Sequence, residues 1–157
     1  MSFTKDKDSD NYATDMEGWK IIKEYIPKDK IIWSPFFCDG KQKEYFKDMG
    51  FDIIHEDEDF FKNNKGDIII DNPPFSKFKD ICLRLKELEK PFILLCPART
   101  LQLKHFQEKF KHDLQLIIPF KRPTFTHLTN PKKGYTPPFG VMYYCYKMNL
   151  KKDLIFI

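Results

Sequence analysis

Glycine-rich loops, clustered cysteines and long apolar runs are all missing from this sequence. Only six of its 157 residues are glycine, and none of them forms a Gly-x-Gly-x-x-Gly sequence, which argues against a Rossmann-type oxidoreductase. No apolar stretch approaches the roughly 20 residues of a membrane helix. The N-terminal sequence MSFTKDKDSD lacks the apolar core of a signal peptide. We therefore predict neither a membrane protein nor a secreted one.

Cysteine is scarce and scattered. The four cysteines, Cys38, Cys82, Cys96 and Cys145, form no Cys-x-x-Cys pair, and no histidine stands at metal-ligand spacing from them. These spacings predict free, packed thiols, no metal site and an intracellular location, cytoplasmic or nuclear.

The composition is that of one soluble globular domain. Hydrophobic residues make up 41% and charged residues 32%, and sixteen phenylalanines raise the aromatic content to 16%. The net charge of +4 permits an acidic partner such as nucleic acid. Residues 1–11 are polar and predict a flexible tail, which leaves 12–157 as the domain.

Apolar runs alternate with amphipathic segments along the chain. The pattern predicts helices over 19–25, 45–49, 77–89 and 101–111. It predicts strands over 30–33, 51–55, 67–71, 91–96, 114–119 and 139–146. Such alternation favours an α/β fold with a parallel sheet covered on both faces. Only loop separates the last two strands, so we expect them to pair antiparallel.

The segment Asp71-Asn72-Pro73-Pro74-Phe75 follows an apolar strand directly. Ligands of doubly wound sheets bind outside the carboxyl ends of such strands. An exocyclic amino group on a purine is a poor nucleophile, because its lone pair is delocalised into the ring. The side-chain oxygen of Asn72 and the carbonyl of Pro73 would accept hydrogen bonds from that amine, on a backbone that the prolines restrict. Phe75 offers a face on which a base can stack.

With this tetrapeptide the sequence resembles the N6-adenine DNA methyltransferases of the amino-methyltransferase superfamily, from residue 12 to about residue 100. The resemblance implies a Rossmann-like, S-adenosylmethionine-dependent methyltransferase fold with a mostly parallel seven-stranded sheet and an antiparallel last strand. It also implies that Asn72, Pro73, Pro74 and Phe75 are catalytic. The implied cofactor-binding residues are Tyr12, Thr14, Ser34, Pro35, Phe36, Asp39, Gly40, Glu56, Asp59, Phe60 and Asn72.

Two positions depart from the family pattern. Where the family has Asp-Pro-Phe-x-Gly-x-Gly, this chain has Ser34 for the acidic residue and Cys38 for the first glycine. Asp39 would then supply the carboxylate that is missing at Ser34. Glu56 would bind the cofactor ribose. A second Pro-Pro-Phe, at 137–139, leads into a strand instead of leaving one, and we predict no role for it in the site.

Basic and aromatic residues alternate in the segment 121–138, which we predict to be a small loop that contacts substrate. Together with two cations near the strand ends, the predicted substrate-binding residues are Lys77, Arg99, Lys121, Arg122, Lys132 and Lys133.

These features predict an adenine-specific DNA methyltransferase whose cofactor is S-adenosylmethionine. Its predicted partner is nucleic acid, and DNA is favoured over RNA. Few residues follow the catalytic half, so we expect target specificity that is low, limited to a short sequence or supplied by a partner subunit. Three alternatives stay open. One is a non-catalytic subunit with a methyltransferase fold, and the others are methyltransferases of RNA or of protein glutamine. A chain rich in lysine and phenylalanine without a recognition domain also suits a viral or phage genome, in which case the protein would act in the host cell.

Overall fold

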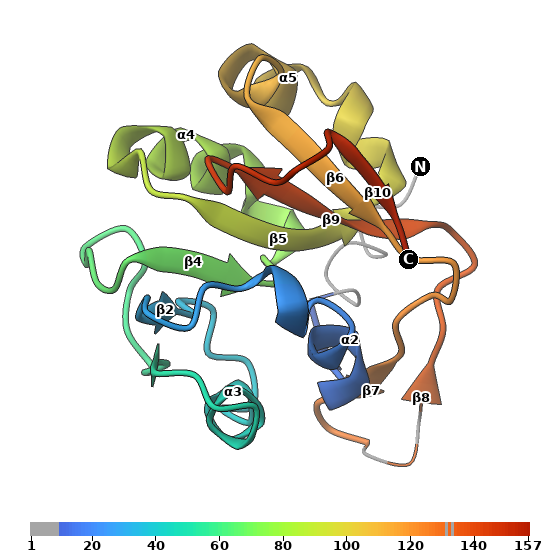
Figure 1. The fold of residues 1–157 in the computed structure, drawn as a ribbon. Coiled ribbons are helices and arrows are strands. Elements are labelled where there is room, and N and C mark those ends of the chain that lie inside the picture. Colours follow the sequence, from blue (N-terminus) through green and yellow to red (C-terminus); the bar gives the residue numbers. More distant parts are fainter. Residues whose placement is uncertain (1–9, 131, 133) are drawn as a thin grey trace.

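The computed structural model describes residues 10–130, 132 and 134–157, which are organised around one large sheet (Figure 1). Seven strands form this sheet in the order β10-β6-β9-β5-β4-β2-β3. They are β2 (Ile32–Trp33), β3 (Ile53–Ile54), β4 (Ile68–Asp71), β5 (Phe92–Pro97), β6 (Leu114–Ile118), β9 (Val141–Tyr146) and β10 (Leu154–Phe156). Neighbouring strands are parallel, except that β9 runs antiparallel to both β5 and β6. This confirms the predicted Rossmann-like α/β class with a mostly parallel seven-stranded sheet.

The antiparallel strand is β9, which matches the segment predicted as the last strand. The sequence pattern did not show that β10 follows it and pairs parallel with β6 at the edge of the sheet. β10 has only three residues, and Leu154 and Phe156 are exposed. Such a short, half-solvated edge strand carries no apolar run that distinguishes it from a loop.

Helices cover both faces of the sheet, as expected. α2 (Met16–Lys20) and α3 (Gln42–Asp48) lie on one face, and α4 (Phe78–Leu88) and α5 (Lys104–Phe110) lie on the other (Figure 1). Single 3₁₀ turns extend three of the helical segments: η1 (Lys23–Tyr25), η2 (Phe75–Lys77) and η3 (Ala98–Gln102). In the part of the chain that the structure describes, no helix has the length and apolarity needed to cross a bilayer.

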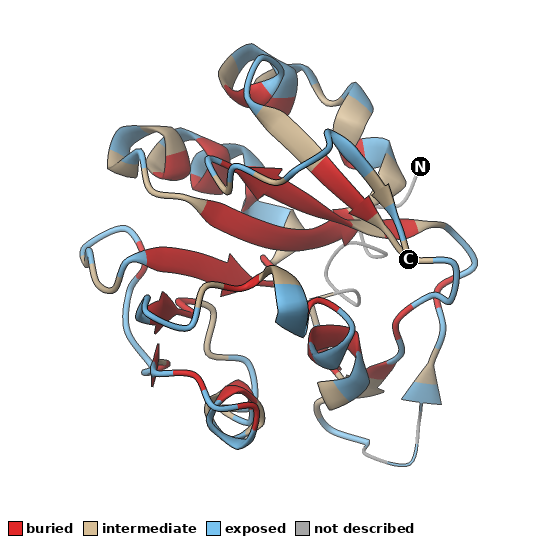
Figure 2. Cartoon of the chain, viewed as in Figure 1, coloured by how far each residue is buried: buried red, intermediate tan, exposed pale blue. Residues whose placement is uncertain are grey.

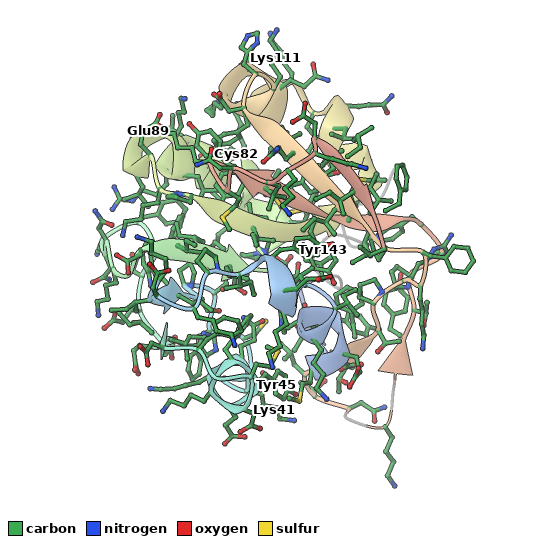
Figure 3. The ribbon with its side chains drawn as sticks, in the orientation of Figure 1. Lys41, Tyr45, Cys82, Glu89, Lys111 and Tyr143 are labelled. Carbon is green, nitrogen blue, oxygen red and sulfur yellow. The ribbon has the colours of Figure 1, made fainter. Side chains whose placement is uncertain are left out.

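The core consists of two apolar layers, one on each face, because alternate residues of a strand point to opposite sides. On β5, Ile93 and Leu95 pack toward α2 and α3, whereas Phe92 and Leu94 pack toward α4 and α5. The central strands are buried almost throughout (Figure 2). Tyr143 on β9 reaches from the sheet toward α2, where its hydroxyl donates to the carbonyl of Gly18 (Figure 3).

A second, three-stranded sheet joins the start of the chain to the segment predicted as a substrate-contacting loop. β1 (Tyr12–Thr14) pairs antiparallel with β7 (Phe125–His127), and β7 pairs with β8 (Gly134–Tyr135). Most of the predicted tail, residues 1–9, lies outside the described residues. At its end, the carbonyl of Asn11 accepts a 2.7 Å hydrogen bond from the N–H of Leu128.

Gly66 makes the turn into β4 in a conformation that other residues rarely adopt. Its φ is +63°, and a Cβ at this position would lie 3.0 Å from both the carbonyl oxygen of Ile31 and the Cβ of Trp33. Gly66→Ala is therefore expected to lower the free energy of unfolding by about 2 kcal/mol, since the left-handed conformation and the close contact both add cost. Chemical denaturation measures this loss. Gly134→Ala is the matched control, because no atom lies within 4 Å of its Cβ position. Equal stability of the two variants would contradict the expectation.

Candidate functional site

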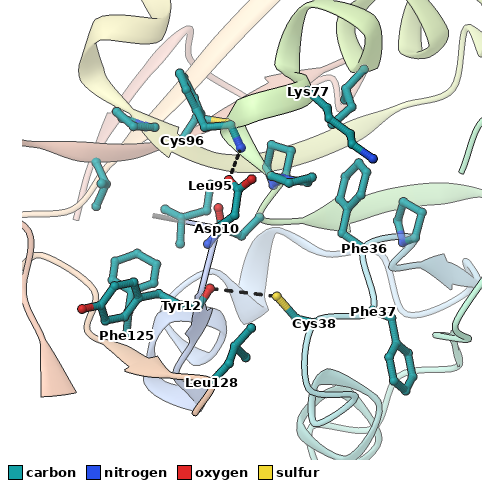
Figure 4. A pocket seen from close by; sticks show the side chains of 18 of the residues that line it. Asp10, Tyr12, Phe36, Phe37, Cys38, Lys77, Leu95, Cys96, Phe125 and Leu128 are labelled. Atoms are coloured by element: carbon teal, nitrogen blue, oxygen red, sulfur yellow. Dashed lines mark hydrogen bonds between the residues drawn. The ribbon is translucent and has the colours of Figure 1, made fainter. Parts of the chain in front are cut away.

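A cleft of about 1530 Å³ opens where the central parallel strands end (Figure 4). Pro35 and Phe36 follow β2, Asn72 follows β4 and Arg99 follows β5, and all four line the cleft. The small sheet forms another wall through Tyr12, Phe125 and Tyr135. The main sheet thus has its cleft at the edge where doubly wound folds bind ligands.

The buried carboxylate of Asp71 fixes the two loops that meet at this edge. Its Oδ2 accepts hydrogen bonds from Ser34 Oγ (2.9 Å) and from the N–H of Phe36 (2.7 Å). Its Oδ1 accepts from Gln42 Nε2 (3.1 Å) and from the N–H of Asn72 (2.8 Å). Burial raises the pKa of Asp71 to about 6, while the backbone donors lower it. Asp71 therefore links the loop after β2 to the turn from Asn72 to Phe75 that follows β4.

Asn72 is oriented by the small sheet. Its Nδ2 donates to Thr14 Oγ1 at 3.1 Å, so the amide hydrogens face β1. The side-chain oxygen Oδ1 is then the group of Asn72 that remains to accept a hydrogen bond from a ligand. Thr14 itself is buried and does not line the cleft.

Asp10 holds the other end of the turn from Asn72 to Phe75. Its carboxylate accepts a 2.9 Å hydrogen bond from the N–H of Phe75, and it also accepts from the hydroxyl of Ser76. The ring of Phe75 stacks on that of Phe78, with centroids 4.9 Å apart and an 8° angle between the planes. The turn is thus fixed from both sides of the cleft.

The second Pro-Pro-Phe segment belongs to the same cleft, which corrects our prediction that it has no role. Pro137, Pro138 and Phe139 all line the cleft. The prediction failed because it considered only the strand that follows Phe139. In the fold, the start of β9 lies beside the carboxyl end of β5, since the two strands are antiparallel.

Eleven of the predicted site residues meet in this cleft. They are Tyr12, Pro35, Phe36, Asp59, Phe60, Asn72, Pro73, Pro74, Phe75, Lys77 and Arg99. Those outside its lining are Thr14, Ser34, Asp39, Gly40, Glu56, Lys121, Arg122 and Lys132. The predicted substrate contact Lys133 lies outside the described residues.

Polar partners explain where several of the outlying residues point. The hydroxyl of Ser34 is used by Asp71 and Gln42, the latter at 2.6 Å. Asp39 pairs with Lys41 at 3.9 Å. Glu56 is exposed and accepts a 2.8 Å hydrogen bond from Lys43, which lowers the pKa of the Glu56 carboxyl.

Two carboxylates of the cleft, those of Glu58 and Asp10, were not predicted from the sequence as site residues. Glu58 lines the cleft two residues beyond Glu56, and the loop between them reveals no periodicity that would select one over the other. Asp10 was assigned to the tail because its neighbours are polar. The pairing of β1 with β7, more than 100 residues apart in the chain, brings it to the turn at Phe75.

Cys38 lies in the left-handed backbone region that favours glycine. Its φ is +52°, and Gly40 follows at +76°. A non-glycine residue tolerates this region at a cost of roughly 1–2 kcal/mol. Desolvation and the charge of Asp71 raise the pKa of the Cys38 thiol to about 12, so the thiol is protonated at neutral pH.

Metal ligands do not cluster in the described part of the chain, where no group of three or more His, Cys, Asp or Glu could hold an ion. The four cysteines are free.

Comparison with known proteins identifies no family model and no curated protein that matches this chain. Among solved structures, the chain is similar to a precorrin-6y C5,15-methyltransferase from Geobacter metallireducens, at 10% sequence identity and a TM-score of 0.45. That similarity covers 89% of this chain and 95% of the other. The fold described above follows from the strand order and the two helical layers.

Proposed function

We propose that this protein is an S-adenosylmethionine-dependent methyltransferase that methylates an exocyclic amino group, N6 of adenine in DNA. The observation that carries the proposal is the hydrogen bond from Asn72 Nδ2 to Thr14 Oγ1 (3.1 Å). It leaves Asn72 Oδ1 as an acceptor at the edge of the cleft, next to the backbone of Pro73. The resemblance of the Asn-Pro-Pro-Phe segment to the N6-adenine enzymes supports the choice of base.

The turn from Asn72 to Phe75 favours chemistry on an amine. Acceptors at Asn72 Oδ1 and the Pro73 carbonyl would take both N–H bonds of the amine, which favours a more tetrahedral nitrogen and frees its lone pair. Pro73 and Pro74 limit the backbone, and Asp71 and Asp10 fix its two ends. The acceptors are therefore in place before substrate binds, which is how preorganised dipoles lower a barrier.

The volume of the cleft and the side chains that line it both suit S-adenosylmethionine. Its volume of about 1530 Å³ exceeds the roughly 300–1,000 Å³ of an ordinary ligand pocket, which leaves room for a base beside the cofactor. Glu58 pairs with Lys65 at 2.7 Å, and Asp59 accepts a 2.8 Å hydrogen bond from the N–H of Phe61, so the ribose hydroxyls would donate to the lone pairs that these two carboxylates retain. The rings of Phe36 and Phe60, whose centroids are 5.1 Å apart, would pack on an adenine. Asp10 retains lone pairs for an ammonium group. When bound, S-adenosylmethionine supplies an activated methyl group on its sulfonium.

Two cations support a nucleic-acid substrate, because Lys77 and Arg99 both line the cleft. DNA is proposed over RNA on the family resemblance alone, and assays on both polymers distinguish them. Target recognition by a partner subunit is part of the same proposal, since the described residues form one seven-stranded sheet with its helices and one three-stranded sheet, which leaves little chain for a recognition domain.

Calorimetric titration with S-adenosylmethionine tests the cofactor site. The wild type is expected to bind in the micromolar range. Glu58→Ala is expected to weaken binding by roughly 10- to 150-fold, because a charge-assisted hydrogen bond is worth about 1.5–3 kcal/mol. Glu56→Ala is the matched control and should stay within about twofold of the wild type, since Glu56 lies outside the cleft.

If Glu56→Ala weakens cofactor binding more than Glu58→Ala does, Glu56 is the residue that binds the ribose. If the wild type and both variants fail to bind cofactor at millimolar concentration, the protein is not a methyltransferase. The non-catalytic subunit would then be the better account.

A further inference from the structure

The guanidinium of Arg99 lies over two aromatic rings of the cleft at once. Its central carbon is 4.9 Å from the ring centroid of Phe75 and 5.1 Å from that of Phe139. The rings come from the two Pro-Pro-Phe segments, and all three side chains line the cleft. We call the space between Phe75 and Phe139 the aromatic slot. Both distances fall within the range of about 4.5–7 Å that separates the centroids of aromatic rings packed on each other.

The backbone on both sides of the aromatic slot is fixed independently of the Arg99 side chain. Phe75 stacks on Phe78, and its N–H donates to Asp10. On the other side, the carbonyl of Pro137 accepts a 3.1 Å hydrogen bond from Arg122, and the carbonyl of Gly140 accepts one of 2.8 Å from the N–H of Ala98. Contacts other than those of Arg99 thus hold both segments that carry the rings.

Arg99 is held in the slot weakly. It is exposed, and no carboxylate in the described part of the chain forms an ion pair with it. Cation–π contacts with the two rings therefore hold its guanidinium in place. An exposed cation–π contact is weaker than the stacking of a nucleobase on an aromatic side chain. A planar base can accordingly displace the planar guanidinium.

We propose that Arg99 occupies the position of the target base in the free protein and moves out to a phosphate when the base enters. The proposal rests on the proposed function in taking the ligand to be a base of nucleic acid. Arg99 then has two opposite effects. It competes with the base for the aromatic slot, and it attracts the phosphodiester backbone that carries the base.

Two ligands separate these effects. In a Phe139→Trp background, the fluorescence of the new tryptophan reports a base stacked in the slot, while Trp19 and Trp33 are buried and give a constant signal. Deoxyadenosine tests competition alone because it has no phosphate, and a 12-nucleotide oligo(dA) tests both effects. Arg99→Ala is expected to tighten deoxyadenosine binding about fivefold and to weaken oligo(dA) binding about tenfold at low salt. The slope of log K against log salt for oligo(dA) should fall by about 0.7.

Lys111→Ala is the matched charge control. Lys111 follows α5, at the opposite end of that helix from η3 (Figure 3), and its removal should change neither constant by more than about twofold. If Arg99→Ala weakens the binding of deoxyadenosine and of oligo(dA) to the same extent, Arg99 is a fixed part of the binding site and the proposal is wrong. If deoxyadenosine binding is unchanged or undetectable in both proteins, Arg99 does not compete for the slot and the proposal is equally wrong.

The measurement is independent of methyl transfer. It uses no cofactor, so an inactive protein can still give opposite shifts for the two ligands, and an active one can fail to give them. If Phe139→Trp does not fold, Phe75→Trp reports from the other side of the same slot.

Discussion

Asn72→Ala is expected to lower kcat for methyl transfer to DNA by about 100- to 1,000-fold. The substitution removes an acceptor that acts on the amine as charge develops on its nitrogen, and loss of one such preorganised group costs about 2.7–4 kcal/mol. A radiolabelled-methyl assay under single-turnover conditions measures the effect. Asn72→Asp keeps an acceptor oxygen at this position, so it should retain activity within about tenfold of the wild type.

Asn64→Ala is the control for this series, because Asn64 is exposed and does not line the cleft. Thr14→Val should reproduce part of the Asn72 effect, since it removes the acceptor that orients the amide at 3.1 Å. A loss of only twofold in Asn72→Ala, with unaltered folding, would show that the amide is not an essential acceptor.

Asp71→Ala is expected to give the largest loss of stability at the site, about 3 kcal/mol or more. Asp71 is 1% exposed, and its removal leaves the Ser34 hydroxyl and two backbone N–H groups without their acceptor, while Gln42 Nε2 keeps its bond to Ser34 Oγ. Each buried donor left unpaired costs about 1–3 kcal/mol. For a chain of this length, that loss lowers the melting temperature by roughly 10 °C. Differential scanning calorimetry, supported by urea denaturation, measures it.

Asp52→Ala is the matched control, because Asp52 is exposed before β3. Asp71→Asn keeps the size of the side chain and should lie between the alanine variant and the wild type. Because Asp71 also fixes the loop after β2, Asp71→Ala should weaken cofactor binding at a temperature where the variant is folded. If Asp71→Ala is as stable as Asp52→Ala, the carboxylate does not organise the two loops.

The central part of the fold could be predicted because its signals are local. The run Ile68-Ile69-Ile70 predicts a buried strand, and the two prolines after Asn72 predict a break directly at its end. The turn and its place at the sheet edge follow from those residues alone. Six of the seven strands of the main sheet were located in this way, although several are shorter than predicted.

The rest of the site depends on contacts between residues far apart in the chain. Tyr12 reaches the cleft through its pairing with His127, and the second Pro-Pro-Phe reaches it because β9 lies against β5. Neither pairing has a signature in the composition of its segment. The preference for Glu58 over Glu56 depends on the course of an irregular loop, where no period fixes which side chains face inward.

The most direct test of the proposed function is mass spectrometry of nucleosides from DNA incubated with the protein and S-adenosylmethionine labelled with deuterium on its methyl group. We expect labelled N6-methyldeoxyadenosine with the wild type and with Asn64→Ala, and a reduction of about 100-fold or more with Asn72→Ala. If the label is found only in N6-methyladenosine from RNA, the substrate is RNA and not DNA. Absence of labelled nucleoside from both polymers, with a folded protein, would contradict methylation of adenine.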